Sequence, residues 1–216
     1  MSLSPAPSPR TRVRRMPERA HYEPDTVAAI VDAAMICTVA FQIDGVVHAI
    51  PTLHWREGAH LYIHGANASR MLKALTEGEA CVTIALADGL VLARSAMHHS
   101  MNYRSVVIYG RFEAVTDPAS KLASLRSFID GLYPGRWETL RPISAKELNA
   151  TTLLRIALDE ASAKVRDCGV KDDEGDLSWP VWAGVIPLRT VAGEPAAEAD
   201  SVLAAVPPSR FDTSPA

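Results

Sequence analysis

Residues 64–70 read His-Gly-Ala-Asn-Ala-Ser-Arg and combine a tight turn with the start of a helix. The free backbone N–H groups at a helix N-terminus attract anions. Ser69 adds a hydroxyl group, and Arg70 adds a planar guanidinium that suits a phosphate. The segment is a candidate phosphate site. The alternative, which the pattern alone favours, is that Asn67 or Ser69 only caps the helix while Arg70 lies in solvent.

A second polar segment, His-His-Ser-Met-Asn-Tyr-Arg-Ser, occupies residues 98–105 and leads into an apolar strand pattern. Asn102, Arg104 and Ser105 offer hydrogen bonds to the edge of a planar heterocycle, and Tyr103 offers a ring for stacking. The two adjacent histidines would point to opposite faces of a strand and have no third ligand at metal spacing. No metal site is therefore predicted.

The third candidate segment is Trp-Pro-Val-Trp-Ala-Gly at residues 179–184. Trp182 is expected to wall a pocket or an interface, although a plain core tryptophan fits the pattern equally well. The sequence has no GxG loop, P-loop, HExxH or GxSxG motif, and no Ser-His-Asp or Cys-His arrangement at a motif spacing. Hydrolytic and thiol chemistry therefore have no support.

The composition predicts one ordinary globular domain. The 216 residues are 48% apolar and 22% charged. No apolar run is long enough for a membrane span, and the N-terminus does not resemble a secretion signal. Three scattered cysteines indicate reduced thiols in a cytoplasmic protein. The net charge of −3 argues against a nucleic-acid partner bound by bulk charge.

Three regions are expected along the chain. Residues 1–19 hold five arginines against one glutamate and are interpreted as a flexible leader. Residues 20–190 form the packed domain, and residues 191–216 form a loose C-terminal tail poor in large apolar residues.

Strand patterns dominate the packed region. The expected strands are 34–43, 46–56, 60–64, 80–87, 103–115, 153–166 and 181–188, and the expected helices are 25–34, 68–76, 117–132 and a short one beginning at the capping box Ser144–Glu147. The apolar stripe of the third helix comprises Leu122, Leu125, Phe128, Ile129 and Leu132. Apolar alternation changes phase near Asp159-Glu160, which predicts a β-bulge there. Many strands with short links and few helices favour an antiparallel β-barrel.

Several ordered segments together resemble the pyridoxamine-phosphate-oxidase-like flavin-binding proteins, and among them the nitroimidazole reductases. The resemblance covers about residues 12–195 and rests on RAHYEPDTVAAIVDAA, HAIPTLHWREGAHLYIHGANASRMLKAL, DGLVLARSAMHHSMNYRSVVIYG, PGRW, EASAKVR and VWAGVIPL. It implies a mostly β, six-stranded antiparallel split barrel of Greek-key type with a few peripheral helices. It also implies a homodimer that binds FMN in the cleft between its subunits.

On this resemblance, Ser69 and Arg70 would bind the FMN phosphate. Strand residues beneath the flavin ring would be Pro51, Thr52, Leu53, His54, Ile63, His64 and Gly65. Trp182 and the segment containing Asn102, Tyr103, Arg104 and Ser105 would lie at the subunit wall. Met71 stands where the oxidases usually have a lysine, and no clear set of pyridoxal-phosphate-binding residues is present, so vitamin B6 oxidation is not expected.

The resemblance assigns His64 the part of a proton donor beside the reduced flavin, with a purely pocket-shaping role as the alternative. The expected function is an FMN-dependent oxidoreductase that reduces a small planar acceptor, such as a nitroaromatic or a quinone, with reduced nicotinamide as a transient donor. Two alternatives stay open. One is a flavin-binding or storage protein without turnover. The other is the same barrel with a deazaflavin or with haem, for which His54, His64, His98 and His99 are available ligands.

Overall fold

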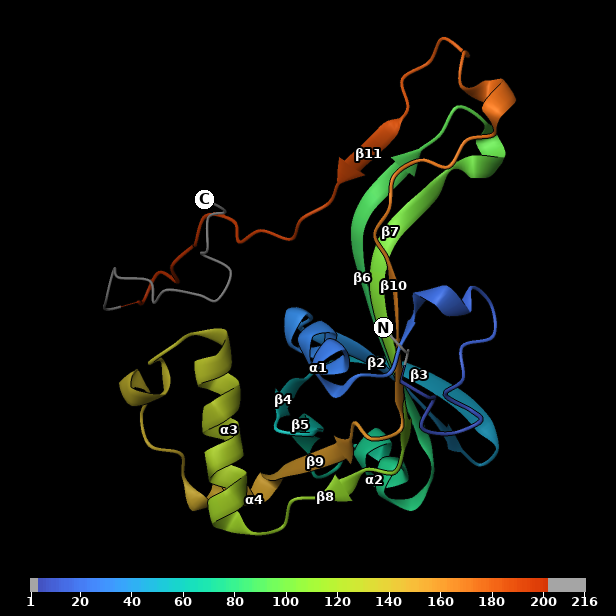
Figure 1. The fold of residues 1–216 in the computed structure, drawn as a ribbon. Helices are drawn as coiled ribbons and strands as arrows, with labels where there is room; N and C mark the ends of the chain where they lie inside the picture. Colours follow the sequence, from blue (N-terminus) through green and yellow to red (C-terminus); the bar gives the residue numbers. More distant parts are fainter. Residues whose placement is uncertain (1–3, 202–216) are drawn as a thin grey trace.

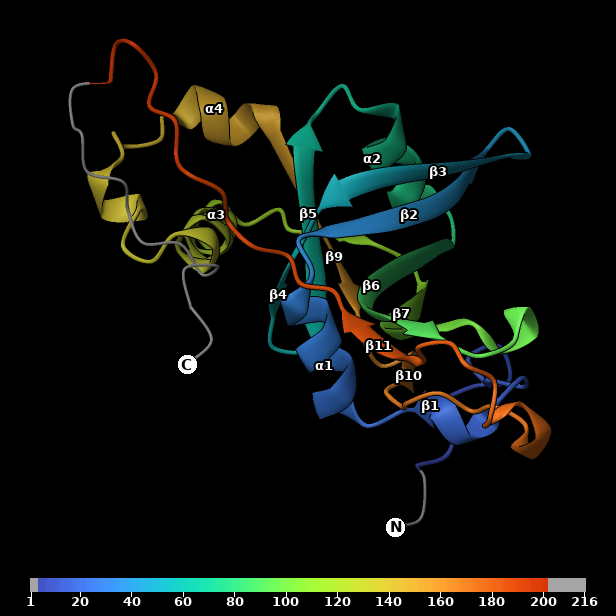
Figure 2. The same ribbon diagram turned by 90° about the horizontal axis from the view of Figure 1, so that it is seen from above.

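Two antiparallel β-sheets form the centre of the computed structural model, which describes residues 4–201 (Figures 1 and 2). The strand order of the larger sheet is β1-β10-β7-β6-β2-β3, with β11 paired to β6, and that of the smaller sheet is β4-β5-β9-β8. The mostly β, antiparallel architecture predicted from the sequence is confirmed, although several strands are short and their number exceeds six.

The strands of the larger sheet are β1 (Ala20–His21), β2 (Ile36–Ile43), β3 (Val46–Leu53), β6 (Ala80–Leu92), β7 (Ser100–Gly110), β10 (Ala161–Arg166) and β11 (Gly184–Pro187). The strands of the smaller sheet are β4 (Trp55–Glu57), β5 (His60–Ala66), β8 (Glu113–Ala114) and β9 (Thr151–Ala157). The helices are α1 (Pro24–Ala33), α2 (Arg70–Glu77), α3 (Pro118–Leu132) and α4 (Ala145–Ala150), and short 3-10 turns are η1 (Pro17–Arg19), η2 (Ala96–His98), η3 (Trp137–Thr139) and η4 (Glu174–Asp176).

The hydrophobic core lies where the two sheets face each other. Its largest fully buried side chains include Val39, Val82, Ile108, Ile63 and Leu154. Each belongs to a strand in which apolar residues alternate with more exposed ones, so that one face of each sheet is covered. Helix α1 adds Val27, Ile30 and Val31 to the same core.

The predicted β-bulge near Asp159-Glu160 is wrong. Strand β9 ends at Ala157 in the smaller sheet, and β10 begins at Ala161 in the larger one. The apolar phase changes because the chain leaves one sheet and joins the other, and each strand then turns its own face towards the core.

The predicted strand 46–56 is also divided. Strand β3 ends at Leu53 and β4 begins at Trp55 in the other sheet, with buried His54 between them. The backbone N–H of His54 donates to the Met35 carbonyl oxygen at 3.2 Å. Pro51 within this pattern indicates an edge strand, a bulge or a position where a ligand takes the missing pairing, and β3 lies at one end of the larger sheet's path.

The predicted strand 80–87 continues to Leu92, and β6 and β7 form a hairpin that projects well beyond the rest of the sheet (Figure 1). The chain after β10 runs along this hairpin to its tip and returns through β11 (Figure 1). Gly89 permits the close pairing of β11, because a Cβ atom there would lie 3.1 Å from Val185 Cγ1 and 3.2 Å from the Ile186 carbonyl oxygen.

The connection from β8 to β9 contains α3, η3 and α4, which lie beside the smaller sheet (Figure 2). Asp117 caps α3 by accepting the Ser120 N–H at 2.8 Å, and Ser144 and Glu147 form the predicted capping box of α4. Leu125 and Phe128 are buried as expected, whereas Leu122 is 36% exposed. Helix α3 contacts the sheet through Phe128, whose ring packs against Trp55. Leu122 lies nearer the start of the helix, outside this contact, and is therefore more exposed.

The described part of the N-terminal leader, residues 4–19, contacts the barrel. The Arg10 guanidinium pairs with Glu79 and Glu160 and lies over the Tyr109 ring. The Lys164 ammonium donates to the Arg15 carbonyl oxygen at 2.9 Å. The flexibility of the leader stays a prediction. Of the C-terminal tail, residues 191–201 are described, and the remainder lies outside the described residues.

Candidate functional site

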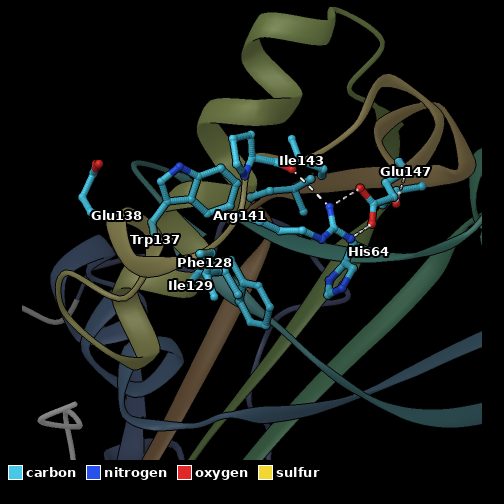
Figure 3. Close-up of a pocket in the computed structure, with 12 residues that line it drawn as sticks. His64, Phe128, Ile129, Trp137, Glu138, Arg141, Ile143 and Glu147 are labelled. Carbon is cyan, nitrogen blue, oxygen red and sulfur yellow. Dashed lines mark hydrogen bonds and ion pairs between the residues drawn. The ribbon is translucent and has the colours of Figure 1, made fainter. Parts of the chain in front are cut away.

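A cavity of about 700 Å³ lies between the smaller sheet and the α3–α4 connection (Figure 3). We call it the α3 cavity. Its walls come from β5, α3, the η3 turn, the loop that follows it and α4. The lining residues are His64, Leu125, Phe128, Ile129, Trp137, Glu138, Leu140, Arg141, Pro142, Ile143, Glu147 and Thr151. Most of them are apolar, so the cavity suits a largely hydrophobic ligand.

His64 is the cavity residue with the clearest capacity for chemistry. It follows Ile63 on β5, and strand alternation therefore turns Ile63 into the core and His64 towards the cavity. Its imidazole lies between two aromatic rings, 5.7 Å from the Trp55 centroid and 5.1 Å from the Phe128 centroid. Its Nδ1 atom is buried, and none of the described residues forms a hydrogen bond with it.

Burial lowers the pKa of His64 below the ordinary value for histidine. The imidazole is therefore neutral at neutral pH, with a lone pair on one ring nitrogen. Such a nitrogen is a ligand for a transition metal. It is a poor proton donor unless a nearby anion restores its positive charge.

The aromatic neighbours of His64 are held by a small polar network. The Trp55 indole N–H donates to Glu57 Oε1 at 2.8 Å, and the Ser124 hydroxyl donates to the same oxygen. This network joins β4 to α3. It therefore fixes the aromatic wall in which His64 lies.

The polar end of the α3 cavity is formed by Arg141 and Glu147. The Arg141 guanidinium donates to Glu147 Oε2 at 3.0 Å, and Figure 3 shows it projecting towards both Glu147 and His64. The guanidinium, together with the Ser144 N–H and hydroxyl, holds the pKa of Glu147 well below its ordinary value. A ligand carboxylate that reached this end would meet a fixed guanidinium.

Ser69 and Arg70 lie at the start of α2 and do not line the α3 cavity. Ser69 Oγ accepts the Leu72 N–H at 3.3 Å, so Ser69 caps the helix. Arg70 is exposed, and among the described residues its guanidinium has no hydrogen bond or ion pair. The helix start thus leaves an uncommitted cation beside free backbone N–H groups.

The predicted flavin-ring residues divide by position. Pro51, Thr52 and Leu53 follow each other on edge strand β3, where Pro51 and Leu53 are exposed. Ile63 is fully buried and His54 is 4% exposed, with its Nε2 atom 3.0 Å from the Val31 carbonyl oxygen. The structure therefore places these two side chains in the core. Gly65 is half-buried on β5.

The predicted residues of β7 are mostly engaged in internal bonds. Asn102 is buried, and its side-chain oxygen accepts from the Arg166 guanidinium and from the Cys168 N–H. Arg104 pairs with Asp88 at 2.7 Å, and the Ser105 hydroxyl donates to the Lys164 carbonyl oxygen at 3.4 Å. Tyr103 is half-buried on the same strand.

Trp182 is 64% exposed and precedes β11. A plain core position for this tryptophan is therefore wrong, because the chain returning from the hairpin tip leaves the ring on the surface. An interface position stays a prediction. Of the site residues predicted from the sequence, all of which lie in the described part of the chain, His64 alone lines the α3 cavity.

The sequence pattern of the family described as pyridoxamine 5'-phosphate oxidase matches residues 23–165, about two thirds of the chain. The chain belongs to this family. A search of curated proteins gives no match.

Three solved structures have folds similar to the fold of this chain. The flavocytochrome Anf3 from Azotobacter vinelandii is 45% identical, with a TM-score of 0.88 and coverage of 95% of this chain and 96% of that one. The FAD and heme binding protein from Mycobacterium smegmatis is 34% identical, with a TM-score of 0.82 and coverage of 88% and 94%. A 5-nitroimidazole antibiotic resistance protein from Bacteroides thetaiotaomicron, 19% identical with a TM-score of 0.58 over 68% and 86%, shares the fold.

The α3 cavity extends this oxidase-family barrel with residues that the sequence analysis did not single out as a site. Leu125 and Phe128 were expected only as the buried stripe of a helix, and Arg141 carried no motif. The capping box at Ser144 and Glu147 was the one available signal, because it fixes the carboxylate that orients Arg141.

Arg70 is followed on α2 by an apolar residue and not by a second cation. The side chain of that residue, Met71, packs against the core. A lysine would instead add a second cation near Arg70. Any anion bound at this helix would therefore depend on Arg70 and on the backbone N–H groups.

None of the helices among residues 4–201 combines the length and the apolarity that a membrane crossing requires.

Proposed function

We propose that this chain is an electron-transfer protein that binds a flavin and a haem. The observation that carries the proposal is the neutral, half-buried His64 imidazole, with an unpartnered Nδ1 among the described residues, at the wall of an apolar cavity. Its support from relatives is the flavocytochrome that is 45% identical and the FAD and heme binding protein that is 34% identical.

The residues of the α3 cavity fit a haem. Its volume of about 700 Å³ lies within the range of cofactor pockets, and Leu125, Phe128 and Trp137 offer apolar walls. His64 would hold the iron through an imidazole nitrogen, and Arg141 would pair with a carboxylate of the haem. When bound, haem supplies one-electron chemistry. The protein's part is to orient the ring, to exclude water with the aromatic wall and to hold the imidazole nitrogen.

A flavin would occupy the other region that the sequence identified, at Arg70, Ser69 and edge strand β3. The uncommitted Arg70 guanidinium and the N–H groups at the start of α2 suit the phosphate that FMN and FAD share. FMN was the sequence prediction, while the Mycobacterium relative is described as binding FAD. The proposal is therefore a flavin with its phosphate at Arg70. Extraction and identification of the cofactor would distinguish FMN from FAD.

A second candidate keeps the flavin but assigns His64 to catalysis. In this version the protein reduces a small planar acceptor, such as a nitroaromatic or a quinone, with electrons from reduced nicotinamide. His64 would provide the proton. The support is the position of an imidazole in a cavity large enough for such an acceptor. A flavin-storage protein would show neither electron transfer through haem nor reduction of a planar acceptor.

The visible spectrum of the purified protein is the first test. We expect flavin absorption together with a Soret band, and extraction should give flavin and haem in equal amounts. Added dithionite should shift the Soret band as the iron is reduced. Flavin without haem, after reconstitution with hemin, would contradict the haem part of the proposal and favour the second candidate. A protein that binds neither flavin nor haem would contradict both candidate functions.

We also propose that the chain forms a homodimer with the flavin near the interface, in the cytoplasm. Edge strand β3 and the neighbouring strand β2 expose Val47, Ile50, Leu53 and Ile36, an apolar surface that a monomer would leave in water. Trp182 is a further exposed ring suited to an interface. The three cysteines are free, which agrees with a reducing compartment.

The variant Val47→Glu is expected to convert a dimer into a monomer, because Val47 is 67% exposed and a carboxylate there would be buried without a partner. Sedimentation velocity measures the change, and flavin content should fall with it. The control Val191→Glu introduces the same charge at a residue that is also exposed and lies outside this surface. A wild-type monomer with full flavin content would rule the interface out.

A further inference from the structure

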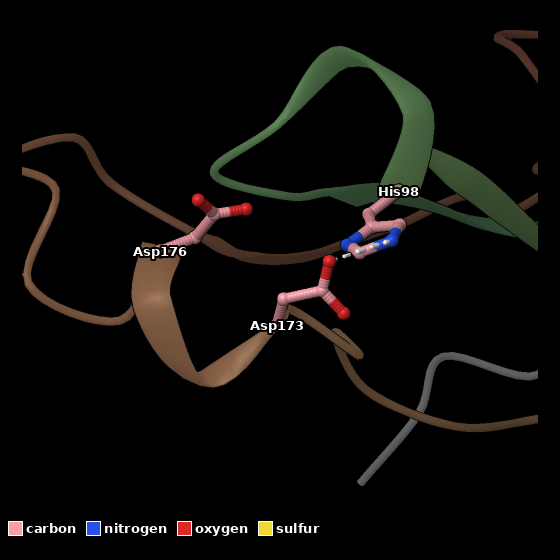
Figure 4. A group of neighbouring side chains, drawn as sticks. All are labelled: His98, Asp173 and Asp176. Atoms are coloured by element: carbon pink, nitrogen blue, oxygen red, sulfur yellow. Dashed lines mark ion pairs between the residues drawn. The ribbon is translucent and has the colours of Figure 1, made fainter.

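A histidine and two aspartates from distant parts of the sequence meet at the tip of the β6–β7 hairpin (Figure 4). His98 ends the short η2 turn. Asp173 precedes the η4 turn that follows β10, and Asp176 is the last residue of that turn. One donor atom of each side chain lies within 4.8 Å of the other two. Small rotations of the side chains would bring all three atoms within bonding distance of a single ion.

A buried ion pair holds the two segments together. The Asp172 carboxylate accepts the Arg94 backbone N–H at 3.0 Å and the Arg94 guanidinium at 2.7 Å. The Asp172 side chain is only 1% exposed, so this contact is an internal one. It holds the segment that contains His98 beside the segment that contains Asp173 and Asp176 in the absence of any ligand.

The η4 turn places both aspartates towards His98. The backbone N–H of Asp176 donates to the Asp173 carbonyl oxygen at 3.0 Å, and the Trp179 N–H donates to the Asp176 carbonyl oxygen at 2.9 Å. These bonds fix the turn, and Figure 4 shows the His98 ring facing the carboxylates. The donor set is therefore built by local structure on two segments.

The three donor groups lack ordinary partners. His98 Nε2 lies 3.9 Å from Asp173 Oδ2, which is longer than a hydrogen bond, and the buried Nδ1 has no partner among the described residues. No lysine or arginine in the described part of the chain forms an ion pair with Asp173 or Asp176. Two carboxylates close together repel each other unless a cation lies between them.

We propose that His98, Asp173 and Asp176 bind one divalent transition-metal ion, with Zn²⁺ or Mn²⁺ as the expected kind. One imidazole nitrogen and two carboxylate oxygens are a ligand set for these ions, and water would complete the coordination. The ion would fasten the tip of the β6–β7 hairpin to the segment that leads into β11. It is separate from the flavin and haem of the proposed function, and its binding does not depend on them.

Isothermal titration of the chelator-treated full-length protein with ZnCl₂ tests the proposal. We expect one Zn²⁺ per chain, and His98→Ala and Asp176→Asn should each weaken binding by at least about 10-fold. The matched controls are His99→Ala, an exposed neighbour bonded to the Ser95 carbonyl oxygen, and Glu174→Gln, an exposed carboxylate of the same turn. Both controls should bind Zn²⁺ like the wild type, and Mn²⁺ should be displaced by Zn²⁺.

Hydrogen exchange provides a second readout that does not depend on activity. Zn²⁺ should protect residues 94–99 and 172–177 in the wild type and in Glu174→Gln, but not in Asp176→Asn. Asp176→Asn keeps the shape of the side chain, so it separates loss of the ligand from loss of the fold. Absence of Zn²⁺ and Mn²⁺ binding by the wild type would overturn the proposal. So would equal weakening in the His99→Ala control.

Discussion

The variant His64→Ala is expected to lose its haem while keeping the barrel. His64 offers the neutral ring nitrogen at the wall of the α3 cavity, and alanine offers no ligand to the iron. The affinity for hemin should fall by at least about 10-fold, and the Soret band of the purified protein should be lost or shifted. Titration of the cofactor-free protein with hemin measures the change. Flavin content should stay at the wild-type value, because Arg70 does not line this cavity.

Rescue by imidazole separates ligation from packing. His64→Ala removes a ring that lies between Trp55 and Phe128, and the vacated space can admit free imidazole. We expect added imidazole to restore the wild-type Soret position in this variant. In the control variant His99→Ala, which alters an exposed histidine outside the cavity, the spectrum should equal that of the wild type throughout.

Two other results would be decisive in different ways. An unchanged haem spectrum in His64→Ala would mean that another group holds the iron, and the haem proposal for this cavity would fall. Full flavin and haem content combined with slow reduction of a nitroaromatic would instead assign His64 to proton transfer. Because burial lowers the pKa of His64, that second role would need an anionic intermediate to stabilise its charged form.

Local chemistry made much of the fold predictable. Pro51 indicated an edge strand, a bulge or a ligand-facing position, and β3 is an edge strand. Asp117 and Ser144 marked the starts of α3 and α4. Each of these features depends on residues close together in the chain, so it can be recognised from the sequence without knowledge of the fold. The crossing near Asp159 was misread as a bulge because alternation reports which face is apolar and not which sheet the strand joins.

The sites were less predictable because their residues come together only through the fold. Phe128 and Leu125 have the spacing of any buried helix stripe, and nothing in that spacing distinguishes a cavity wall from a core. His98 lacked a third ligand in its own segment, and Asp173 and Asp176 reach it only because the chain after β10 returns to the hairpin tip (Figure 4). His64 was named from the family resemblance alone, and the structure adds the reason for its position, because it follows buried Ile63 on β5 and faces away from the core.

The variant Arg70→Ala is expected to weaken flavin binding by about 10- to 150-fold, which corresponds to about 1.5–3 kcal/mol. Arg70 is an exposed guanidinium at the first residue of α2, and charge-assisted hydrogen bonds to a phosphate have this strength. Met71 directly follows Arg70, so the adjacent position supplies no second cation for the phosphate. Fluorescence titration of the cofactor-free protein with FMN and with FAD measures the affinity.

Two companion measurements identify the contact as one with the phosphate. Lys73→Ala removes an exposed cation from the same helix, away from its first residue, and should leave the affinity for FMN unchanged. Riboflavin lacks the phosphate, so its affinity should be the same in Arg70→Ala and in the wild type. Equal losses for riboflavin and FMN would show that Arg70 acts through the fold of the ring site. An unchanged affinity for FMN would exclude Arg70 from the flavin site, because an exposed guanidinium contributes to binding only where it meets the ligand's charge.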